Sequence, residues 1–135
     1  MVYHKKQNKN PSYKFSDFKK ACKDKNKIAI HSNACKGACK YFNLRTEKDI
    51  LNFIKNDGLE NLLFLNTAPW KQNPTIMVDA YEFTSGNKKG YIAYIYNKNI
   101  NKWFIKSFHL SENMNDQMAQ AIKKSELLKK LGLEE

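Results

Sequence analysis

The chain has 135 residues, with 24 basic and 13 acidic side chains and a formal net charge of +11. This length suits one domain whose core needs neither disulfides nor a metal. No stretch approaches the ~18 consecutive apolar residues of a membrane span, and Met1 to Lys6 lack the apolar region of a signal peptide. We therefore expect a cytoplasmic protein with no membrane association. The positive charge favours a polyanionic partner, either nucleic acid or an acidic protein.

The type of basic residue limits what can be inferred from this charge. Arg45 is the only arginine, so nearly every cation is a lysine, and asparagine is also abundant. AT-rich coding DNA produces this pairing of Lys with Asn without any selection for binding. The shortage of arginine also argues against bidentate reading of base edges in a DNA groove.

The beginning of the chain predicts a basic arm followed by a short helix. Residues 1–12 are rich in Lys and Asn and are expected to form a loose arm. Ser16 can serve as N-cap of a helix over residues 17–23, in which apolar positions recur at helical spacing. The apolar run 27–30 then predicts a short strand or an extended link.

Two further helices are predicted before the sheet. Ser32 can cap a helix over residues 33–42, whose apolar positions form one stripe, although Gly37 weakens the helix locally. Thr46 is followed three positions later by an acidic residue, as in a capping box, and opens a third helix that ends at residues 57–58.

The second half of the chain predicts a sheet. Residues 62–65 indicate a short buried strand, and residues 67–74, which contain two prolines, are predicted to form a loop. Three segments rich in aromatic and β-branched residues follow, separated by Gly, Asn and Ser clusters, and these features indicate an antiparallel meander. The three segments are residues 76–83, 89–96 and 102–109.

A last amphipathic helix, capped by Ser111, is predicted over residues 112–131. The order of helices, antiparallel sheet and final helix indicates the α+β fold class. We therefore expect a basic arm at 1–12, an α+β domain at 13–110, and a C-terminal helix at 111–135 that packs on the same domain.

The three cysteines, Cys22, Cys35 and Cys39, are expected to be free thiols, because their number is odd and no secretion signal is present. His31, Cys35 and Cys39 recur at four-residue steps and could share a helix face, with Cys22 completing a zinc site. That spacing matches no common zinc motif. We therefore favour cysteines that are simply buried, and expect neither a metal nor a cofactor.

Polar groups on the meander are the remaining candidates for chemistry, because the sequence has no Gly-rich phosphate loop, HExxH, GxSxG or paired-carboxylate pattern. Strict alternation places His109 on one face of the last strand with Trp103, Ile105 and Ser107, and places Lys106 on the other face. The alternative to a catalytic role is that His109 is a partly exposed residue at a strand end.

Tyr81, Tyr91, Lys89, Lys106 and His109 together would suit the cleavage of RNA without a metal. This reaction needs a base that takes the proton of the 2′-hydroxyl, cations around the phosphate, and an acid that protonates the departing 5′-oxygen. Imidazole titrates near neutral pH, lysine supplies positive charge, and tyrosine can donate a hydrogen bond or transfer a proton.

Seven short segments carry a resemblance to a known family. They are Pro11–Lys20, Ile30–Ala34, Phe42–Leu44, Leu63–Ala68, Met77–Tyr81, Gly90–Ile92 and Ile105–His109. In these segments the chain resembles the MqsR family of type II toxin–antitoxin mRNA interferases, which have a RelE-like fold. The last segment, Ile-Lys-Ser-Phe-His, corresponds to Ile-Val-Ser-Phe-Lys in the family. The resemblance covers about residues 11 to 109 and implies N-terminal helices packed on the meander, with the last helix as an addition.

Four of the family's functional positions fall within these segments. Tyr91 keeps the family's tyrosine, whereas Asn66 stands where the family has a lysine and Val78 where it has a glutamine. His109 replaces a lysine, and this change keeps a group that can be cationic or can transfer a proton.

The resemblance implies a toxin that cleaves mRNA as a metal-independent endoribonuclease. His109 would be the general acid or base, Tyr91 would orient the substrate or transfer a proton, and Lys106 or a neighbouring lysine would hold a phosphate. Tyr81 is a further catalytic candidate from the same sheet. The residues expected to contact RNA are Lys71, Lys88, Lys89 and Asn66.

The alternative is a non-catalytic module that binds RNA, or blocks an acidic protein, through its basic surface. The absence of the family's lysine and glutamine motivates this alternative. A toxin also implies two partners, which are mRNA, free or on the ribosome, and a cognate antitoxin encoded by an adjacent gene.

Overall fold

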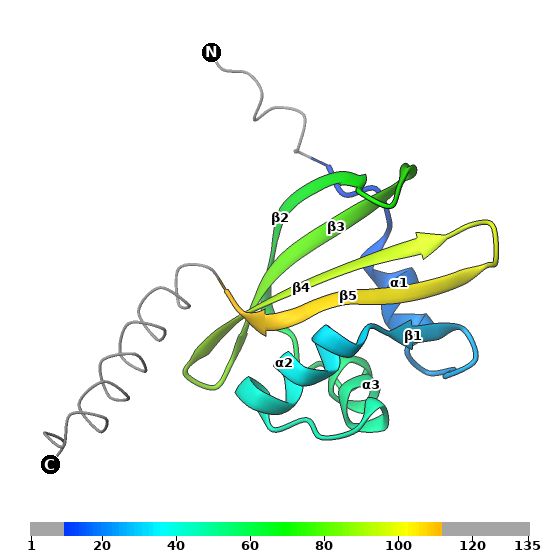
Figure 1. Cartoon of the computed structure of the whole chain (residues 1–135). Coiled ribbons are helices and arrows are strands. Elements are labelled where there is room, and N and C mark those ends of the chain that lie inside the picture. Colours follow the sequence, from blue (N-terminus) through cyan, green and yellow to red (C-terminus); the bar gives the residue numbers. More distant parts are fainter. Residues whose placement is uncertain (1–9, 112–135) are drawn as a thin grey trace, which may run out of the picture.

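The computed structural model describes residues 10–111, which form an α+β domain around one five-stranded sheet (Figure 1). The elements in chain order are α1 (Phe15–Ala21), β1 (Ile28–Ile30), α2 (Ser32–Phe42), α3 (Glu47–Lys55), β2 (Glu60–Trp70), β3 (Asn73–Ser85), β4 (Lys88–Asn97) and β5 (Lys102–Leu110). The α+β class is confirmed. The predicted C-terminal helix and residues 1–9 of the predicted arm lie outside the described residues. Within the described part of the chain, no helix has the length and apolar character needed to cross a membrane.

The sheet has the strand order β1-β5-β4-β3-β2. Strands β2 to β5 are antiparallel neighbours, which confirms the predicted meander. The apolar run that follows α1 becomes β1, which pairs in parallel with β5 over Trp103 to Ile105. The sheet is therefore mixed, and the prediction of a purely antiparallel sheet was wrong at this edge.

Capping explains where two of the helices begin. The Thr46 side chain accepts from the Asp49 backbone N–H, and the Asp49 carboxylate accepts from the Thr46 N–H, so the predicted capping box is confirmed at α3. At α2 the cap is His31 rather than Ser32, because the imidazole Nδ1 accepts the Asn33 N–H at 3.1 Å. The first helix begins at Phe15 without a side-chain cap, so Ser16 is inside it.

The prediction of a loop over residues 67–74 was wrong, because this segment contains the ends of two long strands and the tight turn that joins them. Strand β2 continues to Trp70, and β3 begins at Asn73. Pro69 lacks an N–H for the ladder, but β2 is the outer strand of the sheet, where a missing donor is tolerated. Pro74 is tolerated for a similar reason, since it lies at the start of β3.

The three helices cover one face of the sheet (Figure 1) and enclose an apolar core. The centre of this core is aromatic. The Phe18 ring of α1 stacks on Tyr94 of β4 with centroids 3.8 Å apart, and the Trp103 ring lies 5.8 Å from each of them. The buried core residues of β3, β4 and β5 identify the side of the sheet that faces the helices. They are Tyr81, Phe83, Ile92, Tyr94, Ile105 and Phe108.

A buried carboxylate fixes the chain that enters the domain. Asp79 of β3 is fully buried, and its two oxygens accept the backbone N–H groups of Ser12 and Tyr13 at 3.0 and 2.9 Å. The Tyr13 hydroxyl donates to the Met77 carbonyl at 2.7 Å. These bonds hold the segment that precedes α1 against the middle of β3.

Gly37 allows α2 to lie directly on β5. Because β1 is so short, β5 beyond Ile105 has no strand on its outer side, and α2 packs there instead. A Cβ atom at position 37 would stand only 2.0 Å from the Phe108 carbonyl oxygen and 3.3 Å from the Cβ of His109. The glycine that weakens the isolated helix therefore permits the contact that supports the end of β5.

We predict that Gly37→Ala lowers the free energy of unfolding by about 1–3 kcal/mol, because the added methyl group forces α2 away from β5. Alanine favours a helix over glycine by up to about 1 kcal/mol. If α2 and β5 were not in close contact at this position, Gly37→Ala would therefore stabilise the protein. Lys36→Ala, an exposed change on the same helix, is the control. Urea unfolding measures both variants, and a Gly37→Ala variant as stable as wild type would contradict the predicted contact.

Candidate functional site

The site depends on a β-bulge in β5. Ala93 pairs with Ser107 and Tyr94 pairs with Ile105, so Lys106 is one extra residue in β5 that faces no partner. A bulge interrupts alternation, and both Ile105 and Phe108 consequently lie fully buried on the helix-facing side. The prediction from strict alternation was therefore wrong, because Ile105 and His109 do not share a face.

The bulge brings His109 next to Tyr91 on the face that points away from the helices. The two residues are cross-strand partners, with ring centroids 4.9 Å apart and an angle of 17° between the planes. On its other side Tyr91 pairs with Glu82 of β3. Glu82, Tyr91 and His109 thus form a line across three strands, which we name the cross-strand row; all three are partly exposed.

One nitrogen of His109 is already occupied. Its Nδ1 lies 2.7 Å from the carbonyl oxygen of Leu110. A carbonyl can only accept, so Nδ1 carries a proton in this arrangement, and Nε2 is the nitrogen that can exchange a proton with a ligand. The ring is held from one side by this bond and from another by the Tyr91 ring.

Farther along the same face, the sheet is curved so that side chains of β5 and β2 meet across it. The Lys106 ammonium of β5 lies over the Trp70 ring of β2, 4.8 Å from the centroid, although β3 and β4 separate the two strands. Ala80, Ala93 and Ile95 lie on this face and are nearly or completely buried, although the helices are on the other side. Burial lowers the pKa of Lys106. The face is therefore filled at its centre, and polar side chains lie at the end that holds the cross-strand row.

The other predicted site residues divide between the two faces. Asn66 pairs with Ala80 and Lys89 pairs with Thr84, so both share the face of the cross-strand row. Lys71 is exposed in the β2–β3 turn. Lys88 is on the helix side, where its ammonium donates to the Tyr41 carbonyl and lies over the Phe42 ring.

Tyr81 is not brought to this face. It is buried on the helix-facing side, and its ring stacks at 6.0 Å on that of Tyr94. Burial is the main cause that raises its pKa, with a further contribution from the nearby Asp79 carboxylate. The structure thus gives Tyr81 the environment of a core residue and separates it from His109 by the thickness of the sheet.

Glu82 and Trp70 are the residues of this face that the sequence reasoning missed. Each stands next to a predicted residue only because of strand register, since Glu82 precedes Tyr91 by nine positions and Trp70 precedes Lys106 by thirty-six. The alternation of Asp79, Tyr81 and Phe83 against Ala80 and Glu82 could have placed Glu82 on the face opposite Tyr81.

The cysteines and His31 do not form a metal site. Cys22 is buried, Cys35 half-buried and Cys39 exposed, and His31 is engaged as the α2 cap. Among residues 10–111, no three His, Cys, Asp or Glu side chains lie close enough together to hold a metal ion.

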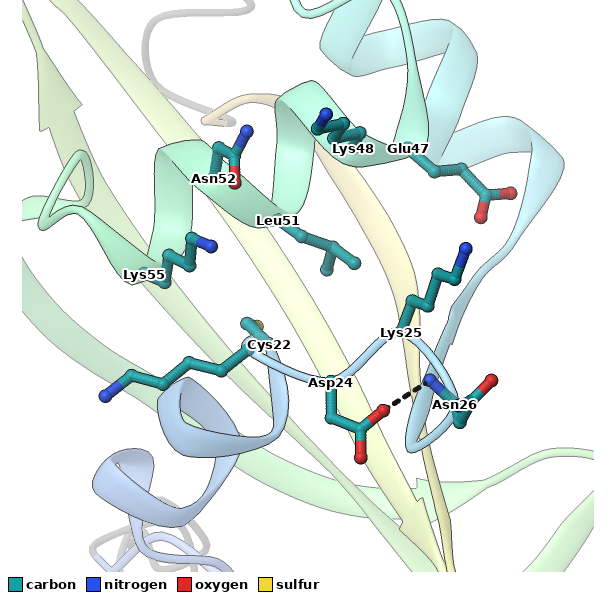
Figure 2. Close-up of a pocket in the computed structure, with 10 residues that line it drawn as sticks. Cys22, Asp24, Lys25, Asn26, Glu47, Lys48, Leu51, Asn52 and Lys55 are labelled. Atoms are coloured by element: carbon teal, nitrogen blue, oxygen red, sulfur yellow. Dashed lines mark hydrogen bonds between the residues drawn. The ribbon is translucent and has the colours of Figure 1, made fainter.

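A pocket of about 530 Å³ lies away from the cross-strand row, between α3 and the loop that joins α1 to β1 (Figure 2). Leu51 points into it from α3, and Cys22 lies opposite. The charged residues that line it are Lys23, Lys25, Lys48 and Lys55, with Asp24 and Glu47. The excess of lysines gives this pocket a net positive charge on the helix side of the molecule.

The burial of Cys22 predicts unequal thiol reactivity. Burial raises the pKa of Cys22 from 9.0 to about 12, which reduces its thiolate fraction about a thousandfold at pH 8. We expect iodoacetamide to label exposed Cys39 in the native protein while Cys22 stays unlabelled until urea is added. Mass spectrometry of the modified peptides, with Cys39→Ser as control, measures this difference. Rapid native labelling of Cys22 would show that the α1–α3 contact opens.

The chain was also compared with known proteins. Comparison with protein-family models, with curated proteins and with solved structures found no match. What the chain does must therefore be inferred from its own residues and from the geometry of the cross-strand row.

Proposed function

We propose that this protein is a toxin of a type II toxin–antitoxin system that cleaves mRNA as a metal-independent endoribonuclease, similar to the MqsR family. The observation that carries the proposal is the contact between His109 and Tyr91. These are the two functional positions of the family pattern at which this chain retains a group able to transfer a proton, and their rings lie 4.9 Å apart on one face.

The proposed chemistry is attack of a 2′-hydroxyl on the adjacent phosphate. His109 serves as a proton-transfer group through Nε2, which is free of the bond to Leu110. The Tyr91 hydroxyl orients the phosphate or donates a hydrogen bond to it. Lys89 and Asn66 lie on the same face and contact the RNA, and Lys106 contributes positive charge from beside Trp70.

The toxin proposal includes two partners. One is mRNA, bound to the basic surface free or on the ribosome. The other is an antitoxin from an adjacent gene, which neutralises the toxin by covering the basic face or an edge of the sheet.

A non-catalytic RNA-binding protein is the second candidate, and two observations favour it. The family's lysine and glutamine are replaced by Asn66 and Val78. In addition, lysines gather around the pocket on the helix side, away from the cross-strand row. Binding of this kind would depend mainly on phosphate charge and would fall steeply with salt.

The first test is cleavage of a long mRNA by the purified protein in EDTA at low salt. We expect defined fragments with 5′-hydroxyl ends, and a loss of about 10²–10⁴ in rate for His109→Ala. Tyr91→Phe removes only the hydroxyl group, and it should also lose activity because that hydroxyl orients the phosphate in the proposed reaction. The matched control is His31→Asn, which changes the remote histidine while keeping a side-chain acceptor at the α2 cap.

Each result selects between the two candidate functions. Cleavage that disappears in folded His109→Ala supports the nuclease. Full activity of both site variants would reject the assignment of His109 and Tyr91. If the protein binds RNA but leaves it intact, both with and without ribosomes, the nuclease is rejected in favour of the binding protein. Binding that weakens between about 50 and 200 mM salt would identify phosphate contacts.

A further inference from the structure

Glu82 is the acidic residue of the cross-strand row, and no ion pair among the described residues accounts for its position there. It is half-buried near the end of β3 and pairs with Tyr91, which in turn pairs with His109. The one ion pair among residues 10–111 joins Lys19 to Asp57, so Glu82 has no ion-pair partner in the described part of the chain. With no ion-pair partner there, its carboxylate can accept a hydrogen bond or a proton from a ligand on this face.

The spacing in the row suits a phosphodiester. Glu82 and His109 are two strands apart, which corresponds to about 10 Å between their backbones. A phosphodiester placed over Tyr91 would be flanked by both side chains, and proton transfer needs each catalytic atom within about 2.6–3.2 Å of the oxygen it serves. Tyr91 lies between them in the row, and its ring stacks on that of His109.

The two ends of the row also have complementary proton chemistry. At neutral pH a carboxylate accepts a proton but has none to donate, whereas an imidazolium can donate one. The Leu110 carbonyl accepts from Nδ1 of His109, so Nε2 is the nitrogen that can give a proton to a ligand. This arrangement assigns the accepting role to the acidic end of the row and the donating role to His109.

Building on the nuclease proposed above, we propose that Glu82 is its general base and His109 its general acid. The Glu82 carboxylate takes the proton of the 2′-hydroxyl as the 2′-oxygen forms a bond to phosphorus. The bond from phosphorus to the 5′-oxygen breaks, and Nε2 of His109 gives its proton to that oxygen. The products are a 2′,3′-cyclic phosphate and a 5′-hydroxyl, and proton exchange with water restores both residues.

The two roles are separated by changing the leaving group. At the cleavage site mapped with wild-type protein, an RNA oligonucleotide is made with either the normal 5′-oxygen or a bridging 5′-sulfur. A thiolate leaves without protonation, so the sulfur substrate needs the base but not the acid. Single-turnover rates are measured for wild type, Glu82→Gln and His109→Ala, and the thermal midpoints confirm folding.

On the normal RNA, we expect both variants to be slower than wild type by about 10²–10⁴. On the sulfur substrate, His109→Ala should recover to within about tenfold of wild type, and Glu82→Gln should not recover. Glu60→Gln is the matched control, since it removes the same charge from an exposed position on the neighbouring strand β2. It should cleave both substrates at the wild-type rate.

Two outcomes would overturn the assignment of Glu82. One is a folded Glu82→Gln variant that cleaves normal RNA as fast as Glu60→Gln. The other is recovery of Glu82→Gln rather than His109→Ala on the sulfur substrate, which would reverse the roles. Failure of the proposed nuclease itself is recognised separately, because wild type would then cleave neither RNA, with or without ribosomes, and the assignment of Glu82 would fall with it.

Discussion

The bulge at Lys106 is the constraint on which the candidate site depends. Without an extra residue, period-two alternation would put His109 on the same side as Ile105, against the helices, and would expel Phe108 from the core. Both Ile105 and Phe108 are fully buried, and the burial of each side chain contributes about 1.5–3 kcal/mol. Apolar packing on the helix side therefore maintains the bulge, and the position of His109 beside Tyr91 follows from it.

The helix layer supports this arrangement from behind. Gly37 lets α2 approach the Phe108 carbonyl directly, at the part of β5 that β1 leaves without a strand neighbour. The contact covers an edge that would otherwise offer backbone groups to other chains. It also places α2 immediately behind His109, so the core that stabilises the domain and the residues proposed for chemistry share one strand.

Features set by local sequence could be predicted, and features set by register could not. The three strands of the meander and the Thr46 capping box are encoded in neighbouring residues, and the structure confirms them. The hairpin at Trp70 does not follow from the sequence because prolines usually break strands; Pro69 is tolerated because β2 is an edge strand, and Pro74 because it lies at the start of β3. The parallel pairing of β1, the bulge and the pairing of Glu82 with Tyr91 all depend on which residues face each other across strands. A single sequence does not specify these pairings, and for that reason Tyr81 was grouped with Tyr91 although the sheet separates them.

Polar groups are unevenly distributed on the outer face, and the positions of the proposed family pattern are divided between its two parts. Val78 and Asn66 stand at the two positions where this chain differs most from that pattern, in the part of the face where Ala80 and Ala93 are nearly buried. Tyr91 and His109 are at the polar end of the same face, next to Glu82. Apolar side chains fill the centre of the face, whereas Asn66 is exposed on the outer strand β2. In the proposed nuclease, the proton acceptor is therefore Glu82, which lies at this polar end of the face beside the two retained positions.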